Sequence, residues 1–184
     1  MPTNKRSWAR GGRIALAVAC VAASPGQATA HDLDRKIEGT YLYKFAHFVT
    51  WPAAAFSGPA AALKICNQGV DPFGAQLEQT LADQRVGSHP VEVMRLPRLD
   101  PEAGCHVAYV AGGPAQSAAQ ALQAIEGSPV LTVTDDARET ADRGIVDLRV
   151  ERGRVRFSID MARAERNGVE ISSKLLALAV VVKR

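Results

Sequence analysis

The stretch "HVAYVAGGPAQSAAQALQAIEGSPVLTVTD" (residues 106–135) decides the fold class of this chain. Residues 106–112 are apolar almost throughout, which predicts a strand buried in the centre of a sheet. A turn and a helix follow, with Pro114 near the start of the helix. Residues 129–135 form a second apolar run, which predicts another buried strand. This order of strand, helix and strand indicates an α/β fold.

The rest of the chain continues the alternation. Strands are predicted at residues 63–69 and 90–96, with a helix to about Asp83 between them that begins near Asp71. "GIVDLRVERGRVRFSID" (residues 144–160) reads as a β-hairpin with a glycine turn. We therefore predict a single three-layer α/β domain with a mixed sheet of about five to six strands flanked by helices.

The first element is predicted to be a helix. "YLYKFAHFVTWP" (residues 41–52) holds five of the ten aromatic residues of the chain. Apolar residues recur every three or four positions, which predicts a helix over residues 32–50 that Pro52 ends. The stripe expected to pack against the sheet consists of Tyr41, Phe45 and Phe48.

The other side of this helix is a candidate binding surface. Tyr43 and His47 lie four residues apart and therefore share a face of the helix. The core stripe does not require these residues. We predict that Tyr43, His47 and, past the helix, Trp51 form a partner or ligand face.

The end of the chain is predicted to be helical. "MARAERNG" (residues 161–168) reads as a short helical turn that Gly168 ends. "VEISSKLLALAVVV" (residues 169–182) reads as a Ser-capped core helix whose apolar face uses Ile171, Leu175 and Leu178. Earlier in the chain, the segment from Asp136 to Glu139 suits a short capped helix.

The first thirty residues have the organisation of a secretory signal peptide. A basic region, the ten-residue apolar run "IALAVACVAA" and the small residues before His31 follow one another. This predicts an exported, periplasmic protein whose mature domain spans residues 31–184. The alternative is a lipid anchor at Cys20. Residues 31–184 hold 18 basic and 19 acidic residues, so no basic block favours nucleic-acid binding.

Two cysteines remain outside the leader, Cys66 and Cys105. An even count in an exported chain permits a disulfide, and each cysteine lies in a short strand-like run. Neighbouring buried strands could bring them within bonding range. The alternative is a pair of free buried thiols, because cysteine also packs as a small apolar residue.

A search for catalytic motifs gives no positive signal. The chain has no phosphate-binding glycine pattern and no G-x-S-x-G motif. None of its four histidines shares a metal-ligand spacing with another. Cys105 and His106 are neighbours on a predicted strand and should point to opposite faces. We therefore predict no enzyme, no metal site and no cofactor.

Taken together, the segments resemble the YfiR-like family (DUF4154) of exported bacterial proteins over about residues 34–182. The matching pieces are "YLYKFAHFVTWP", "LKICNQGVDPFG", "GCHVAYVAG", "PVLTVTDD" and "GIVDLRVERGRVRFSIDMARAERNGVEISSKLLALA". Their order and spacing carry the resemblance, and "ISSKLLALA" after the hairpin is the most specific piece.

The resemblance implies a negative regulator of cyclic di-GMP signalling and of biofilm formation. Its implied partner is the periplasmic domain of a membrane-bound diguanylate cyclase, with an outer-membrane lipoprotein as a second partner and a homodimer as an oligomeric state. It also implies a Cys66–Cys105 disulfide. A second family disulfide would lie near Thr140 and Asp147, where this chain has no cysteine.

Two other functions remain open at this point. A periplasmic small-molecule binding protein would need a pocket at the carboxyl ends of the strands, near residues 67–71 or near Asp135 and Asp136. An envelope enzyme would need His47 or His106 paired with a carboxylate in a cleft.

Overall fold

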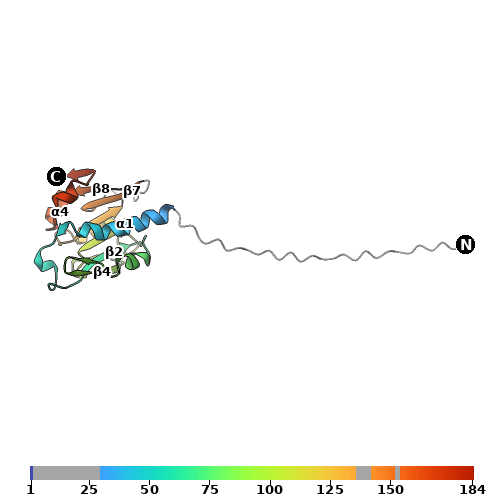
Figure 1. The fold of residues 1–184 in the computed structure, drawn as a ribbon, viewed down its shortest axis with the longest axis horizontal. Helices are drawn as coiled ribbons and strands as arrows, with labels where there is room; N and C mark the ends of the chain where they lie inside the picture. Colours follow the sequence, from blue (N-terminus) through green and yellow to red (C-terminus); the bar gives the residue numbers. More distant parts are fainter. Residues whose placement is uncertain (2–29, 136–141, 152–153) are drawn as a thin grey trace.

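The computed structural model describes Met1 and residues 30–135, 142–151 and 154–184. A mixed sheet forms the middle layer, and helix α1 (Ala30–Ala46) lies across it, with β7 and β8 on one side of the helix and β2 and β4 on the other (Figure 1). The predicted leader and Cys20 lie outside the described residues, as do the short helix expected at 136–139 and residues 152–153 of the hairpin turn.

The main sheet has eight strands in the order β10-β8-β7-β6-β5-β2-β4-β3. The strands are β2 (Leu63–Gly69), β3 (Arg85–Val86), β4 (His89–Leu96), β5 (Val107–Gly112), β6 (Leu131–Asp135), β7 (Val146–Glu151), β8 (Arg154–Asp160) and β10 (Val181–Lys183). The pairs β7–β8 and β3–β4 are antiparallel and the others are parallel. The α/β class with a mixed sheet is confirmed.

Helices cover both faces of this sheet. The α1 side also carries α2 (Gln76–Leu81), α4 (Met161–Arg166) and α5 (Ser173–Leu176), whose buried residues share one core with Phe45 and Phe157. The opposite side carries α3 (Ala118–Ala124), which packs on Cys66, Ala108 and Val110. The predicted three layers are therefore present, with most of the apolar core on the α1 side.

The predicted strand number of five to six is too low. The two additional strands are β3 and β10, which have two and three residues. Strands this short carry no periodicity that a sequence pattern could show. A separate two-stranded sheet pairs β1 (Val49–Thr50) with β9 (Glu170–Ile171).

The first helix ends earlier than predicted, at Ala46 rather than at residue 50. His47 and Phe48 form a turn, and Val49 and Thr50 then pair antiparallel with Ile171 and Glu170. β-Branched residues favour this extended pairing over the end of a helix. The buried face of α1 centres on Leu42 and Phe45, while Tyr41 and Phe48 are partly buried at its margins.

The predicted C-terminal helix is wrong beyond its first turn. Ser172 accepts a hydrogen bond from the backbone N–H of Lys174, but α5 then ends at Leu176. Residues 181–183 form β10, which pairs parallel with β8. Leu178 and Val180 are exposed rather than core residues. The β-branched run satisfies its backbone groups in the sheet, which the local helix signal does not show.

Candidate functional site

The disulfide links neighbouring parallel strands beneath α3. Cys66 lies in β2, and Cys105 lies two residues before β5. Their Cα atoms are 5.9 Å apart, within the usual range for a disulfide. The structure therefore contains the predicted bond, and the free-thiol alternative is wrong. A buried disulfide is consistent with an oxidising compartment.

The predicted partner or ligand face is only partly brought together. The rings of Tyr43 and His47 lie 4.7 Å apart between centroids, and the Tyr43 hydroxyl donates to the carbonyl of Arg85 at 3.2 Å. His47 is exposed. Trp51 does not join them, because its side chain is 9% exposed and its Nε1 donates to the carbonyl of His106 at 3.2 Å.

A partly buried aromatic stack lies next to Trp51. The ring of Phe56 stacks between His106 and His89, with centroids 4.2 Å and 3.9 Å away. The backbone N–H of Lys64 donates to Nδ1 of His106 at 3.1 Å. The proton of the neutral ring therefore lies on Nε2, which donates to the carbonyl of Ala55 at 3.1 Å.

The electrostatics of this stack favour a neutral His106. Burial lowers the pKa of His106, Coulomb interactions with His89 and Lys64 lower it further, and the Ala55 carbonyl opposes them. These partners hold the ring as a structural group. Sequence reasoning missed the stack, because its three rings come from distant segments with no shared motif.

A polar cluster lies at the carboxyl end of β6. Arg35 of α1 contacts Asp135 at 2.6 Å and Glu38 at 2.7 Å, and the Tyr109 hydroxyl donates to Asp135 at 3.4 Å. Burial alone would lower the pKa of Arg35, but its bonds to the two carboxylates raise it above the ordinary value. The small-molecule alternative would need a pocket near Asp135 and Asp136. Asp135 is buried and paired with Arg35, and Asp136 lies outside the described residues.

Asn67 lies nearby on β2, in register with Tyr109 of β5 and Arg95 of β4. Its side chain is buried, and neither its Oδ1 nor its Nδ2 hydrogen-bonds to a described residue. Buried amides are usually hydrogen-bonded. The donor and the acceptor of the Asn67 amide are therefore available to a small polar molecule at this end of the sheet. A narrow cavity of about 10 Å³ lies between α1 and α2, where Gly39, Phe73 and Leu77 are among its lining residues.

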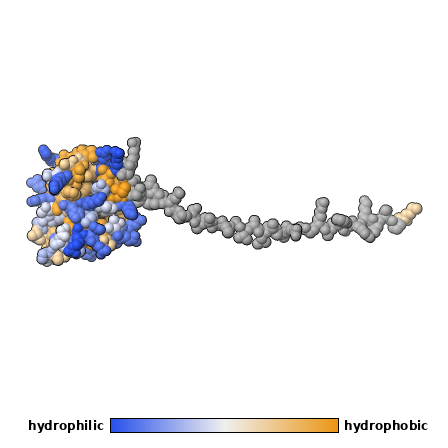
Figure 2. All heavy atoms as spheres, in the orientation of Figure 1, coloured by the Kyte–Doolittle hydropathy of each residue, from blue (hydrophilic) through white to orange (hydrophobic). Residues whose placement is uncertain are grey.

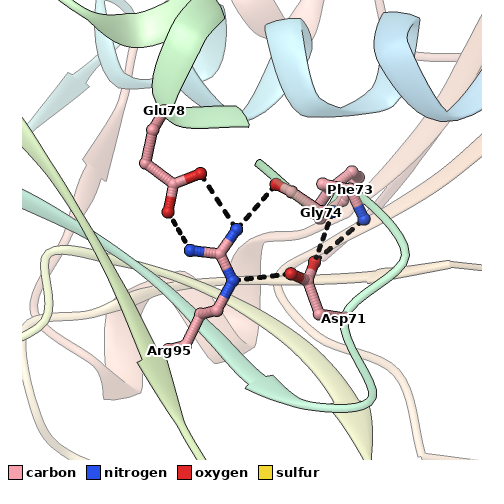
Figure 3. A network of polar contacts seen from close by, with 5 residues as sticks. All are labelled: Asp71, Phe73, Gly74, Glu78 and Arg95. Atoms are coloured by element: carbon pink, nitrogen blue, oxygen red, sulfur yellow. Dashed lines mark hydrogen bonds and ion pairs between the residues drawn. The ribbon is translucent and has the colours of Figure 1, made fainter. Parts of the chain in front are cut away.

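Arg95 organises the segment before α2 (Figure 3). It donates to Asp71 at 2.6 Å and to the carbonyl of Gly74 at 2.6 Å, and it pairs with Glu78. Asp71 also accepts backbone N–H bonds from Phe73 and Gly74, so the capped turn lies at Asp71 and α2 begins later than predicted, at Gln76.

The charges of this network favour the ionised form of Asp71. Burial alone would raise the pKa of Asp71, but the hydrogen bond from Arg95 and the two backbone bonds lower it below the ordinary value. Arg95 is 39% exposed. Solvent screening weakens such an ion pair, so the network adds little free energy. What it does is hold the turn that connects β2 to α2.

Two clefts open at the β10 end of the sheet. One of about 200 Å³ is lined by Arg149, Arg156, Phe157, Ser158, Val180 and Val181. One of about 510 Å³ is lined by Met161, Ala162, Glu165, Leu176, Val182 and Arg184. Within the described ranges, no three His, Cys, Asp or Glu side chains gather into a metal-binding group. No helix in these ranges has the length and apolarity to span a membrane.

The fold and the buried cross-strand bond define a disulfide-bonded three-layer α/β protein. A comparison with family models matches residues 35–180 to the family described as DUF4154, YfiR/HmsC-like. The match covers most of the chain, so the chain belongs to the YfiR/HmsC-like family. A search of curated proteins found no match.

Proposed function

We propose that this chain is an exported regulatory binding protein that lowers cyclic di-GMP synthesis. It does so by binding the periplasmic sensor domain of a membrane-bound diguanylate cyclase. The family match over residues 35–180 carries this proposal. The buried disulfide supports it, because such bonds persist in oxidising compartments such as the periplasm.

Regulation by binding requires a surface and a partner rather than a reaction centre. An outer-membrane lipoprotein that sequesters the chain is the proposed antagonist, and a homodimer is the proposed oligomeric state. Tyr43 and His47 are one proposed contact surface, because their rings touch each other at the end of α1 and His47 is exposed. Trp51 contributes to this surface indirectly, because its indole N–H donates to the carbonyl of His106 and so holds the loop that follows the helix.

The test is deletion of the gene in the native host, followed by complementation. Loss of the protein should raise the cellular cyclic di-GMP concentration and increase surface attachment, and the wild-type gene should reverse both. The proposal fails if both quantities stay unchanged and the sensor domain of the cyclase is not recovered with the tagged protein.

A second candidate function is the binding of a small periplasmic molecule. It is favoured by the cleft of about 510 Å³ between α4 and β10, which combines apolar side chains with Glu165 and Arg184. Its volume falls in the range of small-molecule sites. Thermal shift against a metabolite panel tests this candidate, and the absence of any stabilising compound counts against it.

A further inference from the structure

Asn67 is a buried amide without a hydrogen-bond partner in the described part of the chain. The residue is 2% exposed, and neither its Oδ1 nor its Nδ2 bonds to a residue in the described ranges. Leaving a buried donor and acceptor unpaired costs free energy that a hydrogen-bonded amide does not lose. A molecule that supplies both hydrogen bonds therefore recovers this free energy when it binds.

The next residue shows that this end of the sheet can satisfy a buried amide. Nε2 of Gln68 donates to the carbonyl of Gln116 at 3.1 Å and to that of Pro97 at 3.4 Å. Its Oε1 accepts from the backbone N–H of Gly112 at 3.0 Å. Successive side chains of a strand point to opposite faces, so Gln68 lies on the α3 side and Asn67 on the α1 side. The two neighbouring amides thus differ in their surroundings, and only that of Asn67 needs an outside partner.

Asn67 also lies where the connections of the sheet change sides. β2 leads into α2, which packs in the core on the α1 side, whereas its parallel neighbour β5 leads into α3 on the opposite side. In open α/β sheets, ligands bind outside the carboxyl ends of two such strands. Asn67 is two residues before the end of β2, and its neighbours in register are Tyr109 of β5 and Arg95 of β4. The topology and the unpaired amide therefore indicate the same place.

The groups next to Asn67 favour a neutral ligand. Phe73 packs edge-on against Tyr109 with ring centroids 4.8 Å apart, which places aromatic surface at this end of the sheet. Arg95 is the cation in register with Asn67, and the network of Figure 3 already engages its guanidinium group. An ion buried here without a partner charge would be costly.

The amide of Asn67 also defines the polar edge of the ligand. Its Nδ2 is a donor and its Oδ1 an acceptor, side by side in one plane. The complementary group presents an acceptor beside a donor, as the edge of a primary amide or of a lactam does. Hydrogen bonds weaken steeply when they bend, so one water molecule bonds well to only one of the two atoms. An amide edge bonds well to both.

The turn at residues 70–75 controls access to this position. It follows β2 and carries Phe73. The cavity that Phe73 lines has a volume of about 10 Å³, room for about one water molecule, so a larger ligand enters only when the turn moves. Arg95 holds the turn through Asp71 and Gly74, and its side chain is 39% exposed, which makes these contacts weak. In Figure 2, the surface where Figure 1 labels β2 and β4 is mainly hydrophilic, whereas orange hydrophobic residues are visible where Figure 1 labels β8 and α4.

We propose that Asn67 anchors a small-molecule site at the carboxyl ends of β2 and β5, entered by movement of the turn at residues 70–75. Its ligand is a small neutral molecule with a primary-amide or lactam edge. The site differs from the two clefts at the β10 end of the sheet, which other residues line. It goes beyond the proposed function, which requires a surface for a partner protein and no buried ligand.

The experiment follows the side-chain amide signals of the purified protein in two-dimensional N–H NMR spectra. The test compound is 2-pyrrolidinone, a lactam whose donor lies beside its acceptor, and N-methyl-2-pyrrolidinone is the matched compound without the donor. Asn167 is an internal control, because it is 7% exposed and its amide is hydrogen-bonded to the carbonyl of Val130 and the N–H of Gly127. Asn67→Leu assigns the signal of Asn67 and removes the anchor.

2-Pyrrolidinone should shift the Asn67 signal saturably and leave the Asn167 signal in place. N-Methyl-2-pyrrolidinone should bind at least about tenfold more weakly, because it leaves Oδ1 of Asn67 without a donor. Asn67→Leu should abolish binding while the urea midpoint stays the same or rises, because the change removes no hydrogen bond within the described chain. Equal binding of the two lactams overturns the inference, and so does the absence of a saturable Asn67 shift up to about 0.1 M lactam.

Two further measurements address water and the entrance. Nuclear Overhauser effects from water to the Nδ2 hydrogens of Asn67 detect a bound water molecule, and a bound water that 2-pyrrolidinone does not displace overturns the inference. Arg95→Met should speed the exchange of 2-pyrrolidinone without changing its preference over the N-methyl compound. Unchanged exchange in this variant contradicts entry through the turn. No cyclase domain is present in these samples, so a negative result leaves the proposed function standing.

Discussion

Reduction of the Cys66–Cys105 disulfide should remove a large part of the stability of this domain. The two cysteines are separated by 39 residues. In the chain-entropy model, closing a loop of this length raises the free energy of unfolding by about 4 kcal/mol. A single domain has a total of about 5–15 kcal/mol, so the reduced protein should be only marginally stable. With a urea m-value of about 2 kcal/mol/M, the unfolding midpoint should fall by about 2 M.

Three samples separate the cross-link from the packing of the sulfur atoms. Oxidised protein, reduced protein with both thiols, and Cys66→Ala/Cys105→Ala are unfolded in urea, with Trp51 fluorescence as the signal. Trp51 is the only tryptophan after residue 30 and is buried in the fold. The reduced protein keeps the sulfur atoms, so its difference from the oxidised protein measures the cross-link. The reasoning is refuted if oxidised and reduced proteins share one midpoint while the alanine variant alone is destabilised.

Four other changes test the core and the charged groups. Phe45→Ala should lower the free energy of unfolding by about 4 kcal/mol, measured in urea, because the ring is fully buried. Arg35→Met should cost about 3 kcal/mol, because it removes the ion pairs that Arg35 makes with two buried carboxylates. Arg95→Met should cost less than about 1 kcal/mol, because its network is exposed, and equal losses would contradict this contrast. Because the pKa of His106 is lowered in the fold, its contribution to stability is complete above about pH 6.5 and is lost as the pH falls toward the folded pKa. His106→Asn should therefore reduce the loss of the urea midpoint between about pH 7.5 and 5.5, whereas the exposed control His47→Asn should not.

The parts of the fold predicted from the sequence are those whose signals are local. Residues 106–135 contain the periodicity and turn residues of a strand, a helix and a strand, and the structure has β5, α3 and β6 there. Ser117 and Gln120 form a capping box at the start of α3. The hairpin of residues 144–160 was equally clear, because both strands alternate in the same register.

The errors occurred where a distant strand determines the conformation. Residues 181–183 follow a helix signal, yet they gain backbone hydrogen bonds by pairing with β8. Val49 and Thr50 continue a helical pattern, yet they pair with β9 more than 100 positions later. Local propensity favours one structure at these positions, and pairing in the folded chain favours another.

The same distinction applies to the candidate site. The disulfide was predictable because both cysteines lie at strand-like segments that become neighbours in the sheet. The contact between Arg35 and Asp135 joins residues 100 positions apart, and neither residue lies in a motif. The stacking of Phe56 between His89 and His106 likewise depends on three separate loops and strand ends. Only the folded arrangement reveals these groups.

No described helix lies on the side of β7 and β8 opposite α1, and this follows from how the strands are connected. Parallel neighbours need a crossover, and α3 in the β5–β6 crossover covers the side opposite α1. β7 and β8 are antiparallel and are joined by a hairpin that contributes no helix to either side. The next crossover, from β8 to β10, places Ala164 of α4 and Leu175 of α5 in the core on the α1 side.

This topology exposes whatever the hairpin carries on its other side. Because side chains alternate along a strand, the register that buries Leu148 and Phe157 against α1 directs Arg149 and Arg156 outward. A slip of one residue would turn the arginines into the core, so the register that stabilises the fold also fixes the charge pair. The outward position of both arginines is therefore tied to the fold through one hairpin, and replacing these exposed side chains should change the free energy of unfolding little.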